Sequence, residues 1–400
     1  MVPEGWIKAP TSKFGDVCAG RQRSPHFING TSRFYLRVAN VFDGYIDVSD
    51  INSMKFTDTE FNKYRLKFGD ILLNEGQSSE LVGRAAMYQG IPAESGFQNT
   101  LIRFRAGNLS DPYYALQRFR LCLYDGTFQS ISKKTTSIAH LGVSRFAELE
   151  LSWPPISEQR KIAKILSIWD QSVAATEKLL AKSLQQKKGL MQQLLNGKRR
   201  LPGFTDDWKQ ISFGSAFRER SETGWDSLRL LSITSEDGVI DREDTGRKDT
   251  SNADKSKYLR ILPGDIGYNT MRMWQGVSGL SDLEGLVSPA YTVLTPQEYI
   301  DPLYAAYLFK LPALVHVFYR HSQGLVSDTW NLKYRNFSKI KWCVPGVNEQ
   351  KAIANVLSVS DREIRALKAK LNCVKQEKKY LMQQLLTGKR RVKVDQQEFA

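Results

Sequence analysis

The sequence predicts an α/β (α+β) protein with two strand-rich globular modules, each followed by a long α-helix. Three observations support this prediction: an internal repeat, a heptad pattern in each repeated segment, and short alternating stretches elsewhere that are bounded by turn residues. The chain has 400 residues, of which 41% are hydrophobic and 25% are charged. This composition is ordinary for a globular protein and is sufficient for more than one hydrophobic core.

The internal repeat is visible at a constant offset of 191 residues. Residues 158–163 (EQRKIA) return as residues 349–354 (EQKAIA), and residues 190–200 (LMQQLLNGKRR) return as residues 381–391 (LMQQLLTGKRR). About half of the positions in residues 154–200 are identical to their counterparts. The globular parts share only a framework, such as a Gly-Asp-Ile-x-x-Asn element in each. Two modules with one scaffold and different surfaces indicate two different ligands of one class.

The repeat also predicts the domain boundaries. We expect globular modules and helical repeats to alternate, ending in a short tail, over residues 1–153, 154–200, 201–344, 345–391 and 392–400. The first globular module contains fewer recognisable sequence motifs than the second. In both modules, an Asp-Pro pair is expected to start a helix, at Pro112 and at Pro302.

Each repeated segment carries apolar residues at alternating spacings of four and three, which predicts a coiled-coil seam. The residues predicted to pack the helices together are Ile162, Leu166, Trp169, Val173, Leu180, Leu190, Leu194, Ile353, Leu357, Ile364, Leu367, Leu371, Leu381 and Leu385. Where one seam is polar, the other is usually apolar, which indicates that the helices pack on each other. A seam facing a partner chain fits the pattern equally well. Ser157 and Asn348 are the predicted N-caps, and Gly197 and Gly388 the predicted C-terminal caps.

The net charge of +15 is concentrated in the helical segments, which carry +7 each in residues 158–200 and 349–391. A protein this basic usually binds a polyanion, and nucleic acid is the leading candidate. Two basic clusters stand at the expected helix ends: Lys198, Arg199 and Arg200, and Lys389, Arg390 and Arg391. They suit phosphate contact, and they suit solvated helix ends equally well.

The stretch after each Gly-Asp-Ile element is the best candidate for contacts to DNA bases. Arg side chains suit guanine edges, and Asn or Gln side chains suit adenine edges. The candidates are Asn74, Gln77, Ser78, Arg84 and Arg103 in the first module, and Asn269, Arg272, Trp274 and Gln275 in the second. A loop of this composition is also typical of a solvated surface.

Motifs for direct chemistry are missing from the sequence. The stretch Asp111-Pro112-Tyr113-Tyr114 lacks the second proline of an adenine methyltransferase motif, and there is no P-loop. The four Cys and four His residues are scattered, so we expect neither a disulfide nor a metal site. We also expect no signal peptide, no membrane span and a cytoplasmic location. The chain is predicted not to be an enzyme.

The duplicated modules and the matching EQ…LLxGKRR helices resemble the specificity (S) subunits of type I restriction-modification systems. The string Asn269–Gly276 (NTMRMWQG) and residues 287–291 (VSPAY) add to the resemblance, which covers nearly the whole chain. It implies that each module is a target recognition domain for one half of an asymmetric, bipartite site in double-stranded DNA. It further implies that the two helices pack antiparallel with pseudo-two-fold symmetry and fix the gap between the half-sites.

The resemblance also implies partners and cofactors. Two methyltransferase (M) subunits would dock on the helices, and motor-nuclease (R) subunits would join them. The M subunits would use S-adenosylmethionine to methylate a flipped adenine, and the R subunits would use ATP and Mg; this chain would bind none of these cofactors. Three alternatives stay open: an S subunit of a methyltransferase-only system, one of a fused-enzyme system, or a coiled-coil scaffold that recognises no bases.

Overall fold

A computed structural model of the chain describes residues 2–24, 28–135, 137–246, 254–325 and 329–394. The chain divides into two compact units. Unit 1 comprises Met1–Glu177 together with Lys370–Ala400, and unit 2 comprises Lys178–Ala369. Unit 1 is therefore made from two separate stretches of the sequence.

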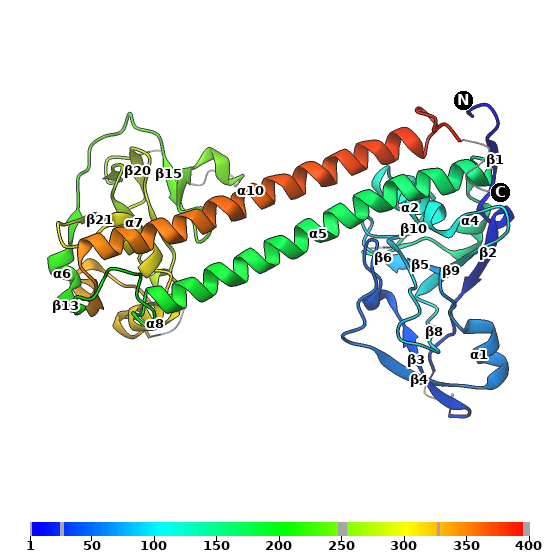
Figure 1. Cartoon of the computed structure of the whole chain (residues 1–400), viewed down its shortest axis with the longest axis horizontal. Coiled ribbons are helices and arrows are strands. Elements are labelled where there is room, and N and C mark those ends of the chain that lie inside the picture. The colour runs from blue at the N-terminus through cyan, green and yellow to red at the C-terminus, as the bar shows by residue number, and fades with distance from the viewer. Residues whose placement is uncertain (1, 25–27, 136, 247–253, 326–328, 395–400) are drawn as a thin grey trace. The chain divides into compact units, whose positions relative to one another are not determined.

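Two long helices, α5 (Ile156–Leu194) and α10 (Val347–Leu385), have 39 residues each (Figure 1). At 1.5 Å per residue, each is about 58 Å long. Both helices cross the boundary between the units, so each unit contains one half of each helix. All residues that the seam predicts to pack are buried or half-buried, whereas most residues between them are exposed.

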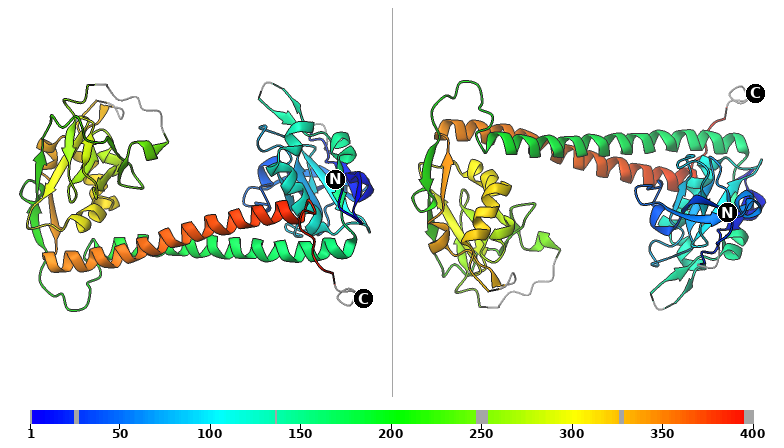
Figure 2. Two further views of the ribbon diagram at one scale, coloured as in Figure 1. Left: turned by 90° about the horizontal axis from the view of Figure 1, so that it is seen from above. Right: turned by 90° about the horizontal axis from the view of Figure 1, so that it is seen from below.

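Within each unit, the start of one long helix packs against the end of the other, so the two segments run antiparallel. In unit 1, Ile162 and Leu166 of α5 share a core with Met382 and Leu385 of α10. In unit 2, Ile353 and Leu357 of α10 share a core with residues 194 and 195 at the end of α5. Figure 2 shows the red end of α10 beside the green start of α5.

The predicted N-caps of the long helices are wrong by a small margin. In α5, the backbone nitrogen of Gln159 donates to the carbonyl oxygen of Pro155 at 3.0 Å, so the first helical turn already includes Pro155. Ser157 and Asn348 therefore lie inside the first turn, one residue after the helix begins. In α10, the backbone nitrogen of Gln350 likewise donates to the carbonyl oxygen of Gly346 at 3.0 Å, so Pro155 and Gly346 occupy the N-cap positions and leave no capping role for these side chains.

Unit 1 is built around a four-stranded antiparallel sheet in the order β2-β9-β5-β7. Its strands are β2 (Gly15–Ala19), β9 (Leu101–Ala106), β5 (Ile71–Asn74) and β7 (Ala85–Met87). The strand pair β1 (Ile7–Pro10) and β12 (Glu150–Trp153) leads directly into α5. A second sheet contains β4 (Asn52–Phe56), β3 (Thr31–Leu36) and β8 (Gly96–Phe97), and a third contains β10 (Lys133–Lys134), β11 (Ala139–His140) and β6 (Gly76–Gln77). The helices are α1 (Asp58–Tyr64), α2 (Pro112–Tyr124), α3 (Thr127–Ile131) and α4 (Val143–Glu148).

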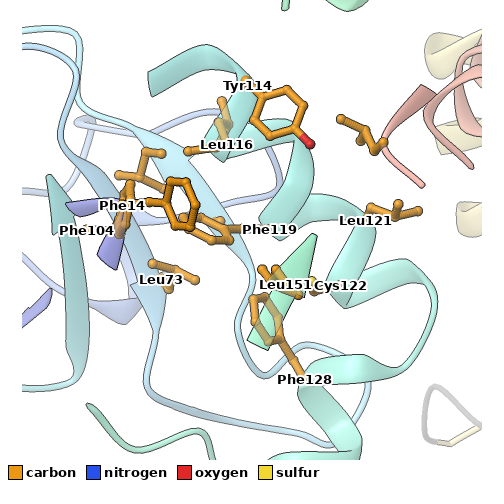
Figure 3. Close-up of a cluster of buried hydrophobic side chains, with 14 of the residues drawn as sticks. Phe14, Leu73, Phe104, Tyr114, Leu116, Phe119, Leu121, Cys122, Phe128 and Leu151 are labelled. Carbon is orange, nitrogen blue, oxygen red and sulfur yellow. The ribbon is translucent and has the colours of Figure 1, made fainter. Parts of the chain in front are cut away.

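The core of unit 1 lies between this sheet and α2. Figure 3 shows Phe14, Phe104 and Phe119 meeting there. The rings of Phe14 and Trp153 are stacked with their centroids 4.3 Å apart, and the edge of Phe119 meets Phe104 at 5.0 Å. Asp111 caps α2 by accepting from the backbone nitrogen of residue 114, as the Asp-Pro pair predicts.

Unit 2 repeats this plan. Its four-stranded antiparallel sheet has the equivalent order β14-β21-β18-β19, with β14 (Phe217–Arg220), β21 (Tyr291–Pro296), β18 (Ile266–Asn269) and β19 (Ser278–Leu280). The strand pair β13 (Lys209–Ser212) and β22 (Lys341–Val344) leads into α10. Two further strand pairs are β15 (Leu231–Ile233) with β16 (Val239–Asp241), and β17 (Leu259–Ile261) with β20 (Gly285–Val287). The helices are α6 (Phe213–Ala216), α7 (Pro302–Leu308), α8 (Pro312–His321) and α9 (Tyr334–Phe337).

The shared sheet order has a consequence for the two modules. The Gly-Asp-Ile element lies at the start of β5 in unit 1 and of β18 in unit 2, so the residues that follow these strands occupy equivalent places.

In the part of the chain that the structure describes, no helix is long and apolar enough to cross a membrane.

Candidate nucleic-acid interface

The last arginine of each basic cluster is part of the fold. Arg391, beyond the end of α10, forms a two-point ion pair with Glu158 at the start of α5, with both N–O distances at 2.8 Å. Glu158 is 3% exposed and also accepts from the indole nitrogen of Trp6. At the equivalent place in unit 2, Arg200 forms a two-point ion pair with Glu349 at 2.6 and 2.7 Å.

These two ion pairs give a structural role to two residues of the predicted DNA surface. The guanidinium groups of Arg200 and Arg391 neutralise buried carboxylates, because a buried charge is unstable without a partner. We therefore assign both residues a structural role. In each cluster the other two basic residues, Lys198 with Arg199 and Lys389 with Arg390, are exposed and stay candidates for phosphate contact.

A glycine precedes each cluster and closes the helix as predicted. Gly197 and Gly388 have φ angles of +66° and +70°, which only glycine adopts without strain. A Cβ atom on Gly388 would lie 2.3 Å from the ring of Pro3 and 3.4 Å from Trp6. The glycine therefore allows the end of α10 to approach closely the segment that precedes β1.

A second pair of equivalent contacts engages one lysine of each long helix. Lys378 of α10 is bonded to Asp170 of α5 in unit 1, and Lys187 of α5 is bonded to Asp361 of α10 in unit 2. Burial lowers the pKa of Lys378, and the charge of Arg120 lowers it further. Lys378 and Lys187 are therefore held between the two helices, while the net charge of each segment stays as the composition gives it.

In unit 2, a short rigid loop follows β18 and presents polar side chains to solvent. Arg272 and Gln275 are exposed, and Met271 is 46% exposed. The backbone is tied by hydrogen bonds from Arg272 to Asn269 at 3.0 Å and from Gln275 to Arg272 at 2.9 Å. The side chain of Asn269 accepts from the backbone nitrogen of Met271 at 3.0 Å. We call residues 269–276 the unit 2 loop.

Asn269 and Trp274 shape this loop from within. Asn269 is half-exposed and acts as a turn-forming side chain through the bond described above. Trp274 is half-buried, donates its indole N–H to the carbonyl oxygen of Met271 at 3.0 Å, and meets the ring of Trp330 at 5.3 Å. Arg272 and Gln275 are therefore the two predicted residues of this loop that point polar groups outward on a fixed backbone.

In unit 1, the equivalent stretch, residues 74–84, is named the unit 1 loop. Gln77, Ser78 and Arg84 are half-exposed. The guanidinium of Arg84 donates to the carbonyl oxygen of Val41 at 2.9 Å and lies 4.7 Å from the ring centre of Phe42. Burial lowers the pKa of Arg84. Arg84 thus has one edge committed to the protein. The side-chain oxygen of Gln77 also accepts from the backbone nitrogen of Ser78 at 3.2 Å, which leaves its amide N–H groups to face solvent.

Two candidates of the first module are buried, which argues against direct contact with bases. Asn74 is 0% exposed and donates to the same Val41 carbonyl as Arg84, at 3.3 Å. Arg103 is 4% exposed, lies on β9, and pairs with Asp16. The sequence pattern does not separate these residues from exposed ones, because it does not show which face of a strand is covered by other parts of the module.

Sequence reasoning missed several exposed or half-buried residues beside these loops. In unit 1, Lys133 and Lys134 lie on β10, in the same small sheet as β6 of the unit 1 loop. In unit 2, Tyr319 and Trp330 meet at 4.8 Å, and Trp330 also touches Trp274. In unit 1, the two adjacent lysines in the sequence could have indicated a basic surface beside the loop. In unit 2 no signal was available, because Trp330 is distant from the loop in sequence.

The duplicated fold, with one polar loop at the same place in each module and long helices that interlock at their ends, defines a two-module recognition protein. Residues 13–185 match the family model described as the type I restriction modification DNA specificity domain. A chain of Methanocaldococcus jannaschii that is assigned as the type I restriction enzyme MjaX specificity subunit is 24% identical over 390 residues, covering 89% of this chain and 87% of the relative.

Solved structures show the same fold. The type I restriction-modification S subunit from M. genitalium matches with a TM-score of 0.57 at 14% identity, over 95% of this chain and 96% of that chain. A chain from a structural study of complex assembly in a type I R-M system matches with a TM-score of 0.60 at 14% identity, over 96% and 98%. Residues 13–185 thus match a type I restriction modification DNA specificity domain, and relatives that align with most of the chain are named type I restriction enzyme specificity subunits.

Proposed function

We propose that the unit 1 loop and the unit 2 loop each recognise one half of an asymmetric, bipartite site in double-stranded DNA. The observation that carries this proposal is the unit 2 loop, where Arg272 and Gln275 are exposed on a backbone held by its own hydrogen bonds. Arg and Gln form two-point hydrogen bonds with guanine and adenine edges. A rigid loop favours such contacts because little conformational freedom is lost on binding.

The two half-sites are proposed to differ because the loops differ. The unit 2 loop offers Arg272 and Gln275, whereas the unit 1 loop offers Gln77, Ser78 and the partly committed Arg84. Equivalent places in a repeated fold thus carry unlike hydrogen-bonding groups. The exposed pairs Lys198–Arg199 and Lys389–Arg390 are proposed to contact phosphates, which strengthens binding without selecting a sequence.

The chain is proposed to direct adenine methylation and restriction by its partners. Two methyltransferase (M) subunits would dock on the two long helices, since the repeat offers each partner the same surface, and motor-nuclease (R) subunits would complete the complex. S-adenosylmethionine, ATP and Mg would be held by those partners and not by this chain. A system that lacks R, or one whose M and R activities are fused in one chain, would use the same recognition surfaces.

The replacement Arg272→Ala tests the proposal. It is expected to weaken discrimination at one base position by about 1–3 kcal/mol, which is roughly 5- to 150-fold, because one two-point contact to a base is lost. The measurement is selection of duplexes with a randomised segment by the full chain in complex with M. Arg218→Ala, an exposed arginine on β14, is the matched control and should leave the selected site unchanged.

The outcomes separate the hypotheses. Loss of preference in one half-site only, with the other half-site and the gap retained, supports base recognition by the unit 2 loop. An unchanged site in the Arg272→Ala complex would contradict it. If the unaltered complex binds duplexes without any preference, the chain is a coiled-coil scaffold.

A further inference from the structure

Lys310, which follows α7, binds the backbone beneath the unit 2 loop. Its ammonium group donates to the carbonyl oxygens of Gly276 at 2.8 Å, Ser278 at 2.7 Å and Ser235 at 3.2 Å. A lysine ammonium has three N–H groups, so all of its donors are used by these three carbonyls. The side chain is half-buried and therefore contributes little to the charged surface.

The first of these carbonyls belongs to the last residue of the unit 2 loop. Gly276 has a φ angle of +77°, and its backbone nitrogen donates to Met273 at 2.8 Å. A Cβ atom at Gly276 would lie 3.1 Å from Val315 and 3.3 Å from the carbonyl oxygen of Phe309. The end of the loop is thus held from three sides: by its own turn, by the neighbouring helices and by the ammonium group.

The equivalent position in unit 1 is also a cation. The Asp-Pro-x-Tyr-Ala motifs at the starts of α2 and α7 align Lys310 with Arg120. Arg120 pairs with Asp43 at 2.7 Å and with Asp170 at 3.2 Å. Asp43 lies two residues after Val41, whose carbonyl oxygen accepts from Arg84 and Asn74 of the unit 1 loop.

We propose that Lys310 is the positioning residue for half-site recognition by unit 2, because its ammonium group fixes the end of the loop that carries Arg272 and Gln275. This inference rests on the proposed function of that loop. Lys310 itself touches no base. It acts through Gly276, which is bonded to the turn that contains both outward-pointing side chains.

The ionisation of Lys310 should make selectivity for the unit 2 half-site depend on pH, which a purely structural role would not. Burial, together with the charge of Lys187 on α5, lowers the pKa of Lys310 to about 8. Lys187 is bonded to Asp361 of α10, which also accepts from the hydroxyl of Tyr307 on α7. A neutral amine has two N–H groups, so one of the three carbonyls loses its donor when Lys310 deprotonates.

A rise in pH is expected to change stability and recognition in opposite directions. Because folding lowers this pKa from 10.5, the folded state resists protonation of Lys310, and its contribution to stability rises as pH increases from about 8 to 10.5. Recognition by the unit 2 loop is expected to fall over the same range. Arg120 stays charged throughout, since the hydrogen bonds and charge of Asp43 outweigh burial and raise its pKa. The unit 1 half-site is therefore an internal control.

The test uses the full chain in complex with M and duplexes with a randomised segment. Lys310→Met is expected to reduce selectivity for the unit 2 half-site by about tenfold, because a charge-assisted hydrogen-bond cluster is lost, while the unit 1 half-site is still selected. Lys341→Met, an exposed lysine on β22, is the control and should not change either half-site.

A second measurement needs no variant. Selection is measured at about pH 6.5 and at about pH 9.5, which lie below and above the lowered pKa of Lys310. The unaltered complex is expected to be less selective for the unit 2 half-site at the higher pH and equally selective for the unit 1 half-site at both. Equal selection of both half-sites by Lys310→Met and at both pH values would overturn the inference while leaving base recognition intact. A complex that selects neither half-site in any form would instead overturn the proposed function.

Discussion

A chain that ends after Arg200 is expected to form a symmetric homodimer. In the full chain, Met382, Leu385 and Leu386 of the second repeat complete the core of unit 1. A truncated chain lacks these three residues, and its own Met191, Leu194 and Leu195 are their identical counterparts at the offset of 191. Two copies can therefore complete each other's cores, and each large apolar side chain buried in this way contributes about 1.5–3 kcal/mol.

The ion pairs of the fold also transfer to the second copy. Arg200 is the counterpart of Arg391, so it is expected to pair with Glu158 of the other copy, and Lys187 is expected to take the place of Lys378 beside Asp170. Light scattering after gel filtration measures the mass directly. The double replacement Leu194→Asp and Leu195→Asp is the control, since it should give only monomer or unfolded chain. A monomeric, folded truncated chain without these replacements would contradict the exchange of helix ends.

Seven residues inserted into both long helices are expected to widen the gap between the two DNA half-sites by about 3 base pairs. One heptad keeps the apolar seam in register and adds about 10 Å to a helix at 1.5 Å per residue. The axial rise of DNA is about 3.4 Å per base pair. The equivalent insertion points are between Glu177 and Lys178 in α5 and between Lys368 and Ala369 in α10.

The selected DNA site of the lengthened chain gives the measurement. Both half-site sequences should remain as they were, because the modules are unchanged, and only the gap should grow. A matched control inserts four residues in each helix, which breaks the heptad register and is expected to destabilise the coiled coil. A lengthened chain that selects the original gap would rule out a role of helix length in spacing.

The long helices were predictable from the sequence because the repeat and the heptad seam are strong, periodic signals. The positions Ile162 and Leu166, chosen by spacing alone, are fully buried. The helices begin two residues earlier than the predicted N-caps imply, because the local pattern does not show which residue ahead of Glu158 and Glu349 takes the N-cap position. The shared order of the two four-stranded sheets agrees with the weak Gly-Asp-Ile echo between the modules.

The candidate site was less predictable because burial depends on contacts between distant segments. The three basic residues of a Lys-Arg-Arg cluster look alike in sequence, yet the last one is paired with a buried glutamate more than a hundred residues away. Asn74 and Asn269 occupy the same motif position, but only Asn74 is fully buried. Lys310 carried no sequence signal, since its partners are backbone carbonyls.

The repeated motifs themselves have a physical explanation. Glu158 and Arg391 come from different copies of the repeat but meet in one unit, and Glu349 and Arg200 do the same in the other. Loss of Arg391 would therefore leave the buried Glu158 unpaired in unit 1, and loss of Arg200 would leave the buried Glu349 unpaired in unit 2. This arrangement accounts for near-identity at the helix ends and for freedom to vary in the loops.

The most direct test of the central claim is methylome sequencing of cells that contain the M subunit with and without this chain. We predict a new N6-methyladenine motif that appears only with the chain and consists of two short, unlike half-sites separated by a fixed gap. A stable complex with M that produces no such motif would contradict recognition of a bipartite site by the two loops.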